Sequence, residues 1–228
     1  MRPGRIIFVI TLLLCAIAPQ AKAQEETYKF DIGAQVGMSG YLGDANRSNI
    51  FKHPGFSAGF SARYQANARW CLRAVLSTMT LSGNTADFDD VLPGGREYSF
   101  KSQAFDLSAR WEFNFFPYGI GETYKKLKRW SPYLTLGVGA TLATCDGVVS
   151  VAPCIPMGFG VKYKLKPRVN VGVEFTMTKV FGDKIDGELY DLYQIKSSFV
   201  KNTDWYSNIS VSVSYEFGER CVTCHYVD

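Results

Sequence analysis

The chain has 228 residues, enough for one domain or two small ones, and 46% of them are hydrophobic. Its formal net charge is +4, but Arg2, Arg5 and Lys22 lie in a segment that we predict to be removed. Without these three, the 25 basic residues become 22, against 21 acidic ones. The mature protein is then nearly neutral, so its charge gives no support to a nucleic-acid-binding function.

Residues 1–23 have the layout of a secretory signal peptide. Arg2 and Arg5 precede an apolar stretch at 6–17, and Ala-Lys-Ala at 21–23 offers a small-residue cleavage site. The apolar stretch is too short for a spanning helix, which needs about 20 residues. We predict cleavage after residue 23, with Gln24 as the new N-terminus. No later apolar run is long enough to span, which leaves a soluble exported protein or a β-barrel.

The mature chain shows apolar and polar residues alternating with a period of two in eight segments. Side chains of a strand point to opposite faces in turn, so each segment has one apolar and one polar face. Segments of about ten residues or more suit strands that cross a membrane at a tilt of about 45°. The predicted strands cover 28–38, 56–65, 69–80, 105–115, 133–142, 155–165, 169–179 and 208–217.

A soluble eight-stranded barrel, such as a lipocalin, is the main alternative fold. Its apolar face would point inward, whereas here full charges such as Arg110 and Glu112 occupy the polar face at mid-strand. Aromatic residues also gather near the strand ends, as an interfacial girdle requires. They are Tyr28, Tyr64, Trp70, Phe115, Phe116, Trp130, Tyr133, Trp205 and Phe217. We therefore predict an all-β fold, an eight-stranded antiparallel transmembrane barrel over residues 24–217 with a short tail at 218–228.

The connections between these strands alternate in length. Residues 66–68 and 166–168 form short turns, whereas 39–55, 81–103, 143–154 and 180–204 form longer polar loops. Short turns of outer-membrane barrels face the periplasm and long loops face the exterior, which predicts that both termini are periplasmic. The connection at 117–132 breaks the rule, because it is long and falls on the periplasmic side.

Charges on the polar face nearly balance. Opposite charges enclosed in a narrow lumen favour a network of ion pairs, because unpaired buried charges are costly. A selective pore would show an excess of one sign, so we predict a plugged barrel. The network is expected to centre on Arg63, Arg73, Asp106, Arg110, Glu112 and Glu174, joined by Lys29, Asp31, Lys162, Lys164 and Glu216.

The sequence favours neither an enzyme nor a cofactor-binding protein. His53 and His225 are predicted on opposite sides of the membrane, and no nucleophile motif is present. The acidic residues at 87–90 fit no EF-type calcium loop and are expected to be solvated. Cys221-Val222-Thr223-Cys224-His225 matches the haem attachment pattern, but the tail offers no apolar pocket for a haem. We therefore expect no enzymatic activity, metal or cofactor.

Five cysteines remain after signal cleavage, in a compartment that permits disulfides. Cys145 and Cys154 flank one predicted exterior loop and form our favoured pair. Cys71 is expected to pack in the lumen. Cys221 and Cys224 follow the last strand and are expected either to pair with each other or to form an intermolecular disulfide with a partner protein.

The long periplasmic connection is a candidate binding surface. Tyr, Trp and Arg are enriched at binding hot spots, although a basic collar that touches anionic headgroups is an alternative reading. Together with the cysteine tail, this connection suggests an anchor for a periplasmic assembly. The candidate contact residues are Tyr118, Tyr124, Lys125, Lys126, Lys128, Arg129, Trp130, Cys221 and Cys224.

Several stretches mark a resemblance to a family of known proteins. They are Gly-Met-Ser-Gly-Tyr-Leu-Gly-Asp at 37–44, Asn-Phe-Phe-Pro-Tyr at 114–118, the strand at 133–139 and Asn-Thr-Asp-Trp-Tyr at 202–206. With the cysteine-bearing tail, they resemble a family of small Bacteroidota outer-membrane barrels that includes PorG of the type IX secretion system. The resemblance implies an outer-membrane location and association with the periplasmic PorK–PorN ring. The alternatives are a membrane-stabilising or adhesive barrel and a narrow porin.

Overall fold

The computed structural model describes residues 28–42, 54–84, 99–120, 127–145, 148–181 and 205–219. These residues form eight strands, which are 11 to 19 residues long. Within this part of the chain, no helix is long and apolar enough to cross a membrane. The strands are β1 (Tyr28–Leu42), β2 (Gly55–Gln65), β3 (Trp70–Asn84), β4 (Ser99–Asn114), β5 (Trp130–Cys145), β6 (Val148–Lys166), β7 (Val169–Val180) and β8 (Trp205–Glu219).

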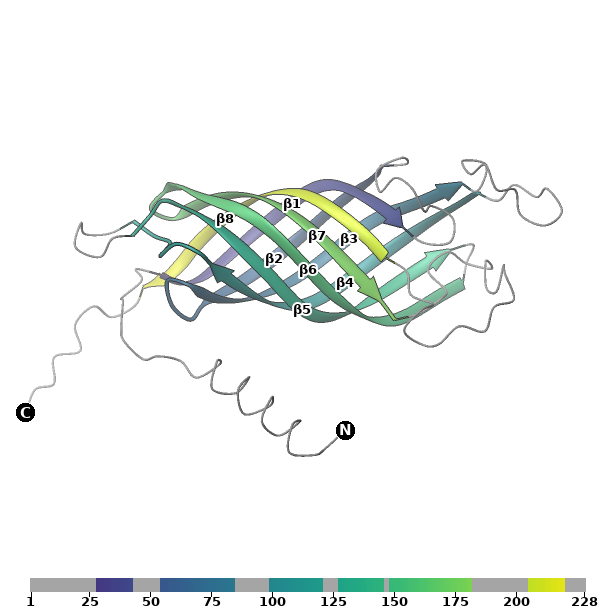
Figure 1. The fold of residues 1–228 in the computed structure, drawn as a ribbon, viewed down its shortest axis with the longest axis horizontal. Coiled ribbons are helices and arrows are strands. Elements are labelled where there is room, and N and C mark those ends of the chain that lie inside the picture. The colour runs from purple at the N-terminus through teal and green to yellow at the C-terminus, as the bar shows by residue number, and fades with distance from the viewer. Residues whose placement is uncertain are drawn as a thin grey trace, which may run out of the picture.

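The strands close into a single barrel in which each pairs antiparallel with its neighbours in the sequence. The last seam joins β1 to β8, so that Ile32 lies opposite Ala62 of β2 on one side and Tyr215 of β8 on the other. The strands are strongly tilted against the long axis of the barrel (Figure 1). The predicted fold, a closed eight-stranded antiparallel meander, is confirmed. We call the end where β1 begins and β8 ends the terminal end, and the opposite end the far end.

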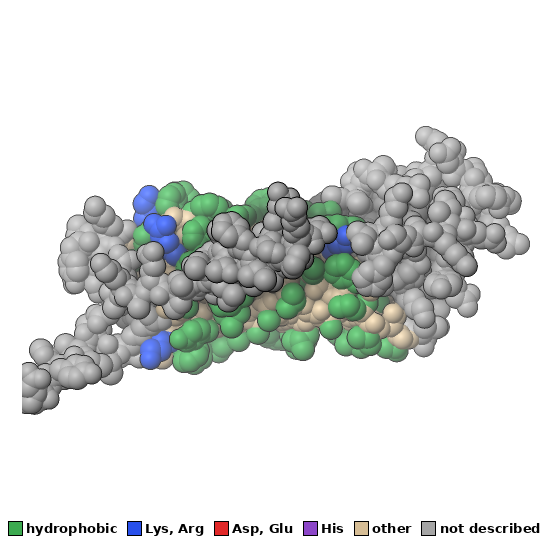
Figure 2. Space-filling view, turned by 60° about the horizontal axis from the view of Figure 1, so that its bottom comes forward, with side chains coloured by type: hydrophobic (Ala, Val, Ile, Leu, Met, Phe, Trp, Pro, Cys, Tyr) green, Lys and Arg blue, Asp and Glu red, His purple; other side chains and the backbone are tan. Residues whose placement is uncertain are grey.

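The outer surface of the barrel is apolar, and we call it the belt. Phe60 is 69% exposed, Val138 is 66% exposed and Leu107 is 60% exposed. Figure 2 shows hydrophobic side chains over much of the visible barrel surface, with Lys and Arg gathered mainly at one of its ends. A soluble barrel would bury such side chains. An exposed apolar surface of this extent must be covered by an apolar environment such as lipid. The lipocalin-like alternative is therefore excluded by the direction in which the side chains point.

An aromatic girdle encircles the terminal end. Phe30 stacks on Phe217 and contacts Tyr64, with ring centroids 5.7 and 5.6 Å apart. Tyr64, Trp70, Phe115, Trp130 and Phe217, all predicted for the girdle, are outward and more than two-fifths exposed. Amphipathic and large aromatic rings at this level match the interfacial girdles of membrane barrels.

Several strands are longer than predicted, above all β5 and β6. The expected loop 143–154 is mostly strand, and only Asp146 and Gly147 separate the two strands. An Asp-Gly pair between alternating segments is a strong hairpin signal that our reading of the sequence overlooked. The polar residues Thr144 and Ser150 belong to the hairpin, where they are exposed or half-buried.

This hairpin rules out the predicted disulfide between Cys145 and Cys154. Cys145 lies opposite Val148, whereas Cys154 lies opposite Gly139, six positions further along β5. At about 3.3 Å per residue, the two cysteines are about 20 Å apart along the strands, and a disulfide needs Cα atoms within about 7 Å. Cys154 instead holds a free, buried thiol. The prediction is wrong because we took a long hairpin for a loop.

Candidate functional site

The lumen is filled by a balanced set of charges. Among the side chains that the structure describes, five cations and five carboxylates are buried, each less than 9% exposed. The predicted network is confirmed, with one exception: Lys29 is exposed outside the barrel. The buried charges are Asp31, Arg63, Arg73, Asp106, Arg110, Glu112, Lys162, Lys164, Glu174 and Glu216.

The core of the network is a row of three arginines on neighbouring strands. Arg63 of β2 lies opposite Arg73 of β3, and Arg73 lies opposite Arg110 of β4. Like charges that face each other across a strand pair are destabilising, so the row requires carboxylates from elsewhere in the lumen. Glu112 and Glu174 provide them.

Glu112 pairs with the first two arginines of the row, Arg63 and Arg73. Its Oε2 accepts a hydrogen bond from Arg63 Nε at 3.2 Å and lies 3.7 Å from Arg73 Nη1. Its Oε1 accepts a bond from Lys162 Nζ at 2.5 Å. Arg63 also pairs with Asp31 at 3.1 Å. One carboxylate thus contacts three cations, and its loss would leave more buried charge unpaired than the loss of any one of them.

Glu174 reaches across the lumen from β7 to the other end of the row. Arg73 Nη2 donates to its Oε2 at 2.6 Å, and Arg110 Nη1 donates to its Oε1 at 3.4 Å. Because β7 does not neighbour β3 or β4 in the barrel, these bonds cross the interior and fill it. Such pairs place charged side chains across the middle of the lumen at this level.

Tyr133 belongs to this network and not to the outer girdle. It is 2% exposed, and its hydroxyl donates to Glu174 Oε2 at 2.6 Å. Gly160, opposite it on β6, makes room for the ring, because a Cβ at that position would lie 2.7 Å from the Tyr133 hydroxyl. The girdle prediction for Tyr133 was wrong, since it followed residue type and ignored that Leu134 and Leu136 already fix the outward positions.

Tyr118 closes the lumen at the terminal end. It belongs to the long connection between β4 and β5, yet it is only 3% exposed. Its hydroxyl donates to Asn170 Oδ1 at 2.7 Å, and Lys162 Nζ lies 4.5 Å from the ring centroid. Burial raises the pKa of Tyr118 above its usual value, so the phenol stays neutral. Its predicted place on a contact surface was wrong; we call this residue the stopper.

Backbone bonds hold the stopper in place. Tyr118 N donates to Ala68 O at 3.2 Å, Gly119 N donates to Lys128 O at 3.0 Å and Lys128 N donates to Pro117 O at 2.8 Å. Beside them, Phe116 and Trp130 meet edge to face with centroids 5.0 Å apart. The two arms of the connection are therefore hydrogen-bonded to each other, and one arm is hydrogen-bonded to the β2–β3 turn.

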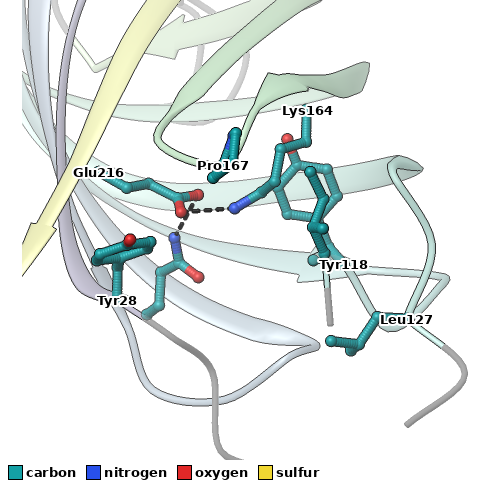
Figure 3. Close-up of a pocket in the computed structure, with 9 residues that line it drawn as sticks. Tyr28, Tyr118, Leu127, Lys164, Pro167 and Glu216 are labelled. Carbon is teal, nitrogen blue, oxygen red and sulfur yellow. Dashed lines mark hydrogen bonds and ion pairs between the residues drawn. The ribbon is translucent and has the colours of Figure 1, made fainter. Parts of the chain in front are cut away.

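A small cavity of about 100 Å³ remains between the stopper and the barrel wall. Figure 3 shows Tyr118 and Lys164 on one side of it and Tyr28 and Glu216 on the other. Lys164 Nζ donates to Glu216 at 2.5 Å, and Gln65 Nε2 donates to the other oxygen of that carboxylate at 3.1 Å. Since the lining polar groups already bond each other, the cavity is a gap beside the stopper, too small for a substrate-sized ligand.

The far half of the lumen holds a cluster of buried apolar side chains, together with small polar ones such as Ser39, Ser102 and Thr178. Leu81 is 1% exposed, Met79 is 3% exposed and Val180 is fully buried, next to Tyr41 and Tyr206. The two halves meet where the Tyr206 hydroxyl donates to Asp106 Oδ2 at 2.6 Å. We did not predict this apolar cluster, because the predicted strands leave out Tyr41, Leu81, Val180 and Tyr206. The alternation simply continues through Met79 and Leu81, which was the available signal.

The other predicted contact residues fall into two groups. Lys128, Arg129 and Trp130 are exposed at the terminal end, as predicted. Tyr124, Lys125, Lys126, Cys221 and Cys224 lie outside the described residues. Cys71 is buried in the lumen as expected, where Asn114 Nδ2 lies 3.7 Å from its sulfur.

Comparison with known proteins places this architecture among outer-membrane barrels. A family model described as "Domain of unknown function (DUF6089)" matches residues 5–226. A search of curated proteins finds no match. Neisserial surface protein A (NspA) superposes with a TM-score of 0.51 at 16% identity, over 82% of this chain and 97% of that one. A major outer membrane protein from Thermus thermophilus gives 0.51 at 15% identity, over 82% and 99%. At these identities the likeness concerns the fold alone.

Proposed function

We propose, from the premise that this chain belongs to the DUF6089 family of unknown function, that it is a sealed, non-enzymatic outer-membrane barrel. Its working surface is the terminal end, which faces the periplasm and anchors partner proteins there. The observation that carries this proposal is the filled lumen inside an apolar belt. Such a molecule is stable in lipid but offers no path for solutes.

The belt supports a place in the membrane. Its side chains alternate along the strands with buried side chains, many of them polar or charged, as in barrels that face lipid outside and a polar interior inside. An aqueous exterior would leave this entire surface hydrated at a cost of roughly 25 cal/mol for each Å² of apolar area. Lipid removes that cost.

The sealed lumen argues against the narrow-porin alternative. Three layers block it in turn: the stopper, the cross-lumen ion pairs and the apolar cluster of the far half. We expect no steady ion current through the chain in planar bilayers. A reproducible single-channel conductance would contradict the proposal.

More finely, we propose a role in the type IX secretion system similar to that of PorG. The support is the sequence resemblance together with Lys128, Arg129 and Trp130, which are exposed beside the hydrogen-bonded connection. The partners would be the periplasmic ring proteins PorK and PorN, with Cys221 or Cys224 available for an intermolecular disulfide. A barrel without solute transport or catalysis is suited to such anchoring.

Deletion of the gene, followed by an assay of secreted proteins with a C-terminal sorting domain, tests this role. We expect their export to fall, and the ring proteins to co-purify with the intact barrel. Replacement of Lys125, Lys126, Lys128 and Arg129 by Glu should release the ring proteins while the barrel still folds. Lys179→Glu at the far end is the matched control. Normal export after deletion would leave only a general membrane-stabilising role.

A further inference from the structure

The exposed charged side chains that the structure describes at the terminal end all have one sign. Among the side chains that the structure describes, each charged group more than about a third exposed is a cation, and each carboxylate is buried in the lumen. These cations come from β1, the β2–β3 turn, the β4–β5 connection, the end of β6 and the β6–β7 turn, so they surround the mouth of the barrel. We call Lys29, Arg69, Lys128, Arg129, Lys166 and Arg168 the cationic ring.

The ring lies immediately beyond the aromatic girdle, at the level where hydrocarbon gives way to headgroups. Lys29 precedes Phe30, Arg69 precedes Trp70 and Arg129 precedes Trp130 in the chain. Each of these aromatic residues is more than two-fifths exposed on the outer surface. A cation next to an interfacial aromatic residue is placed to reach phosphate groups of the adjoining leaflet.

Two ring members are held in position by aromatic side chains. Arg168 Nε donates to the Tyr28 hydroxyl at 3.0 Å, its Nη1 donates to the Tyr215 hydroxyl at 3.4 Å and its Cζ lies 5.0 Å from the Tyr28 ring centroid. Lys128 Nζ lies 3.9 Å from the centroid of the Phe116 ring. These contacts restrict the movement of both side chains at the terminal end.

The far end differs. Among the side chains that the structure describes at that end, the cation is Lys179, which is half-buried, with its Nζ 5.6 and 5.5 Å from the ring centroids of Phe181 and Trp205. Among the side chains that the structure describes, exposed cations therefore gather at the terminal end of the belt. Cations near an anionic leaflet contribute about 1 kcal/mol each at moderate ionic strength, so several in one ring would select strongly among lipids.

We propose that the cationic ring binds the headgroups of anionic phospholipids and so gathers them around the terminal end of the barrel. The inference rests on the proposed membrane location. Beyond that location, it specifies the class of lipid that is bound, the leaflet that holds this lipid and the residues that bind it. The ring also fixes which end of the barrel meets the phospholipid leaflet.

Tryptophan quenching by brominated lipids tests the proposal. The detergent-purified full chain carrying Trp111→Phe and Trp205→Phe keeps Trp70 and Trp130 as reporters at the terminal end. In vesicles of phosphatidylcholine with a minor share of brominated phosphatidylglycerol, we expect enrichment of the anionic lipid on the order of fivefold at low salt. It should disappear at about 1 M salt, where screening is strong. A chain that keeps only Trp205 is the comparison for the far end and should show a smaller enrichment than Trp70 and Trp130.

The variant Lys29→Gln, Arg69→Gln, Lys166→Gln and Arg168→Gln should lose the enrichment, whereas Lys179→Gln should keep it. If the fourfold variant does not fold, Arg69→Gln and Lys166→Gln are tested singly and should each reduce it. Equal quenching by anionic and zwitterionic lipids in the parent chain would overturn the inference and point to an acidic protein as occupant of the ring. Absence of quenching by any brominated lipid would instead overturn the membrane location itself.

Discussion

The two halves of the lumen solve the same packing problem with opposite chemistry. Towards the terminal end, inward positions carry ten charged side chains that neutralise one another, whereas towards the far end they carry Tyr41, Met79, Leu81, Val180 and Tyr206. The backbone alternation and the outer belt are the same in both halves. The comparison shows that the barrel needs a filled interior, and that either paired charges or apolar side chains can provide it.

The halves should nevertheless respond differently to mutation. A charge that loses its partner stays buried and unpaired, whereas a truncated apolar side chain leaves only a cavity. The loss of stability in the first case is electrostatic, whereas in the second case it comes from lost packing contacts. Three substitutions test this difference, with expected effects that decrease in order.

Glu112→Gln is expected to have the largest effect. The substitution keeps the shape of the side chain but removes the negative charge that contacts Arg63, Arg73 and Lys162. We expect the free energy of unfolding to fall by about 3–5 kcal/mol, measured by urea titration of tryptophan fluorescence in vesicles. Gln103→Ala, on the outer face of the same strand, is the control and should change it by less than about 0.5 kcal/mol. An unchanged urea midpoint would show that the pairs are dispensable.

Leu81→Ala in the apolar cluster should cost less. Truncation of a fully buried leucine removes its packing contacts and leaves a cavity, for which we expect a loss of about 2–4 kcal/mol. Leu76→Ala on the lipid-facing side of the same strand is the matched control and should cost less, since its side chain is 53% exposed. If the two variants were equally destabilised, the far half would not be packed as a core.

Tyr118→Phe should have the smallest effect. It removes the hydrogen bond to Asn170 but keeps the ring above Lys162, so we expect a loss of about 1 kcal/mol. The loss should be local and visible as faster amide hydrogen exchange at 115–120. In an Asn170→Ala background, Tyr118→Phe should have little further effect, because the bond that it removes is already lost. Independent, additive effects would mean that this bond does not hold the stopper.

The strands and the lumen charges could be predicted because one rule governs both. Once alternation fixed the outward position of Trp111, it also fixed Arg110 and Glu112 as inward. Where the prediction failed, residue type had been allowed to override this alternation. Tyr133 was assigned to the girdle because it is aromatic, although its neighbour Leu134 already occupied the outer face.

The stopper could not be predicted in the same way. Tyr118 lies outside the alternating segments, and its burial depends on Asn170, which is 52 residues away. An aromatic residue in a basic connection is equally compatible with a contact surface. The free thiol of Cys154 was missed for a different reason: the Asp-Gly pair at 146–147 was read as part of a loop.

The bonds from Glu174 to Arg73 and from Gln65 to Glu216 join residues 101 and 151 positions apart. They exist only when the seam between β1 and β8 is sealed, since an open sheet in lipid would turn its ten charges towards hydrocarbon. Insertion and sealing must therefore occur as one concerted event, or along a route that keeps the inner face hydrated until the end. Contacts so distant in the sequence also make folding slow, which lengthens the time for which the unsealed sheet must keep these charges away from hydrocarbon.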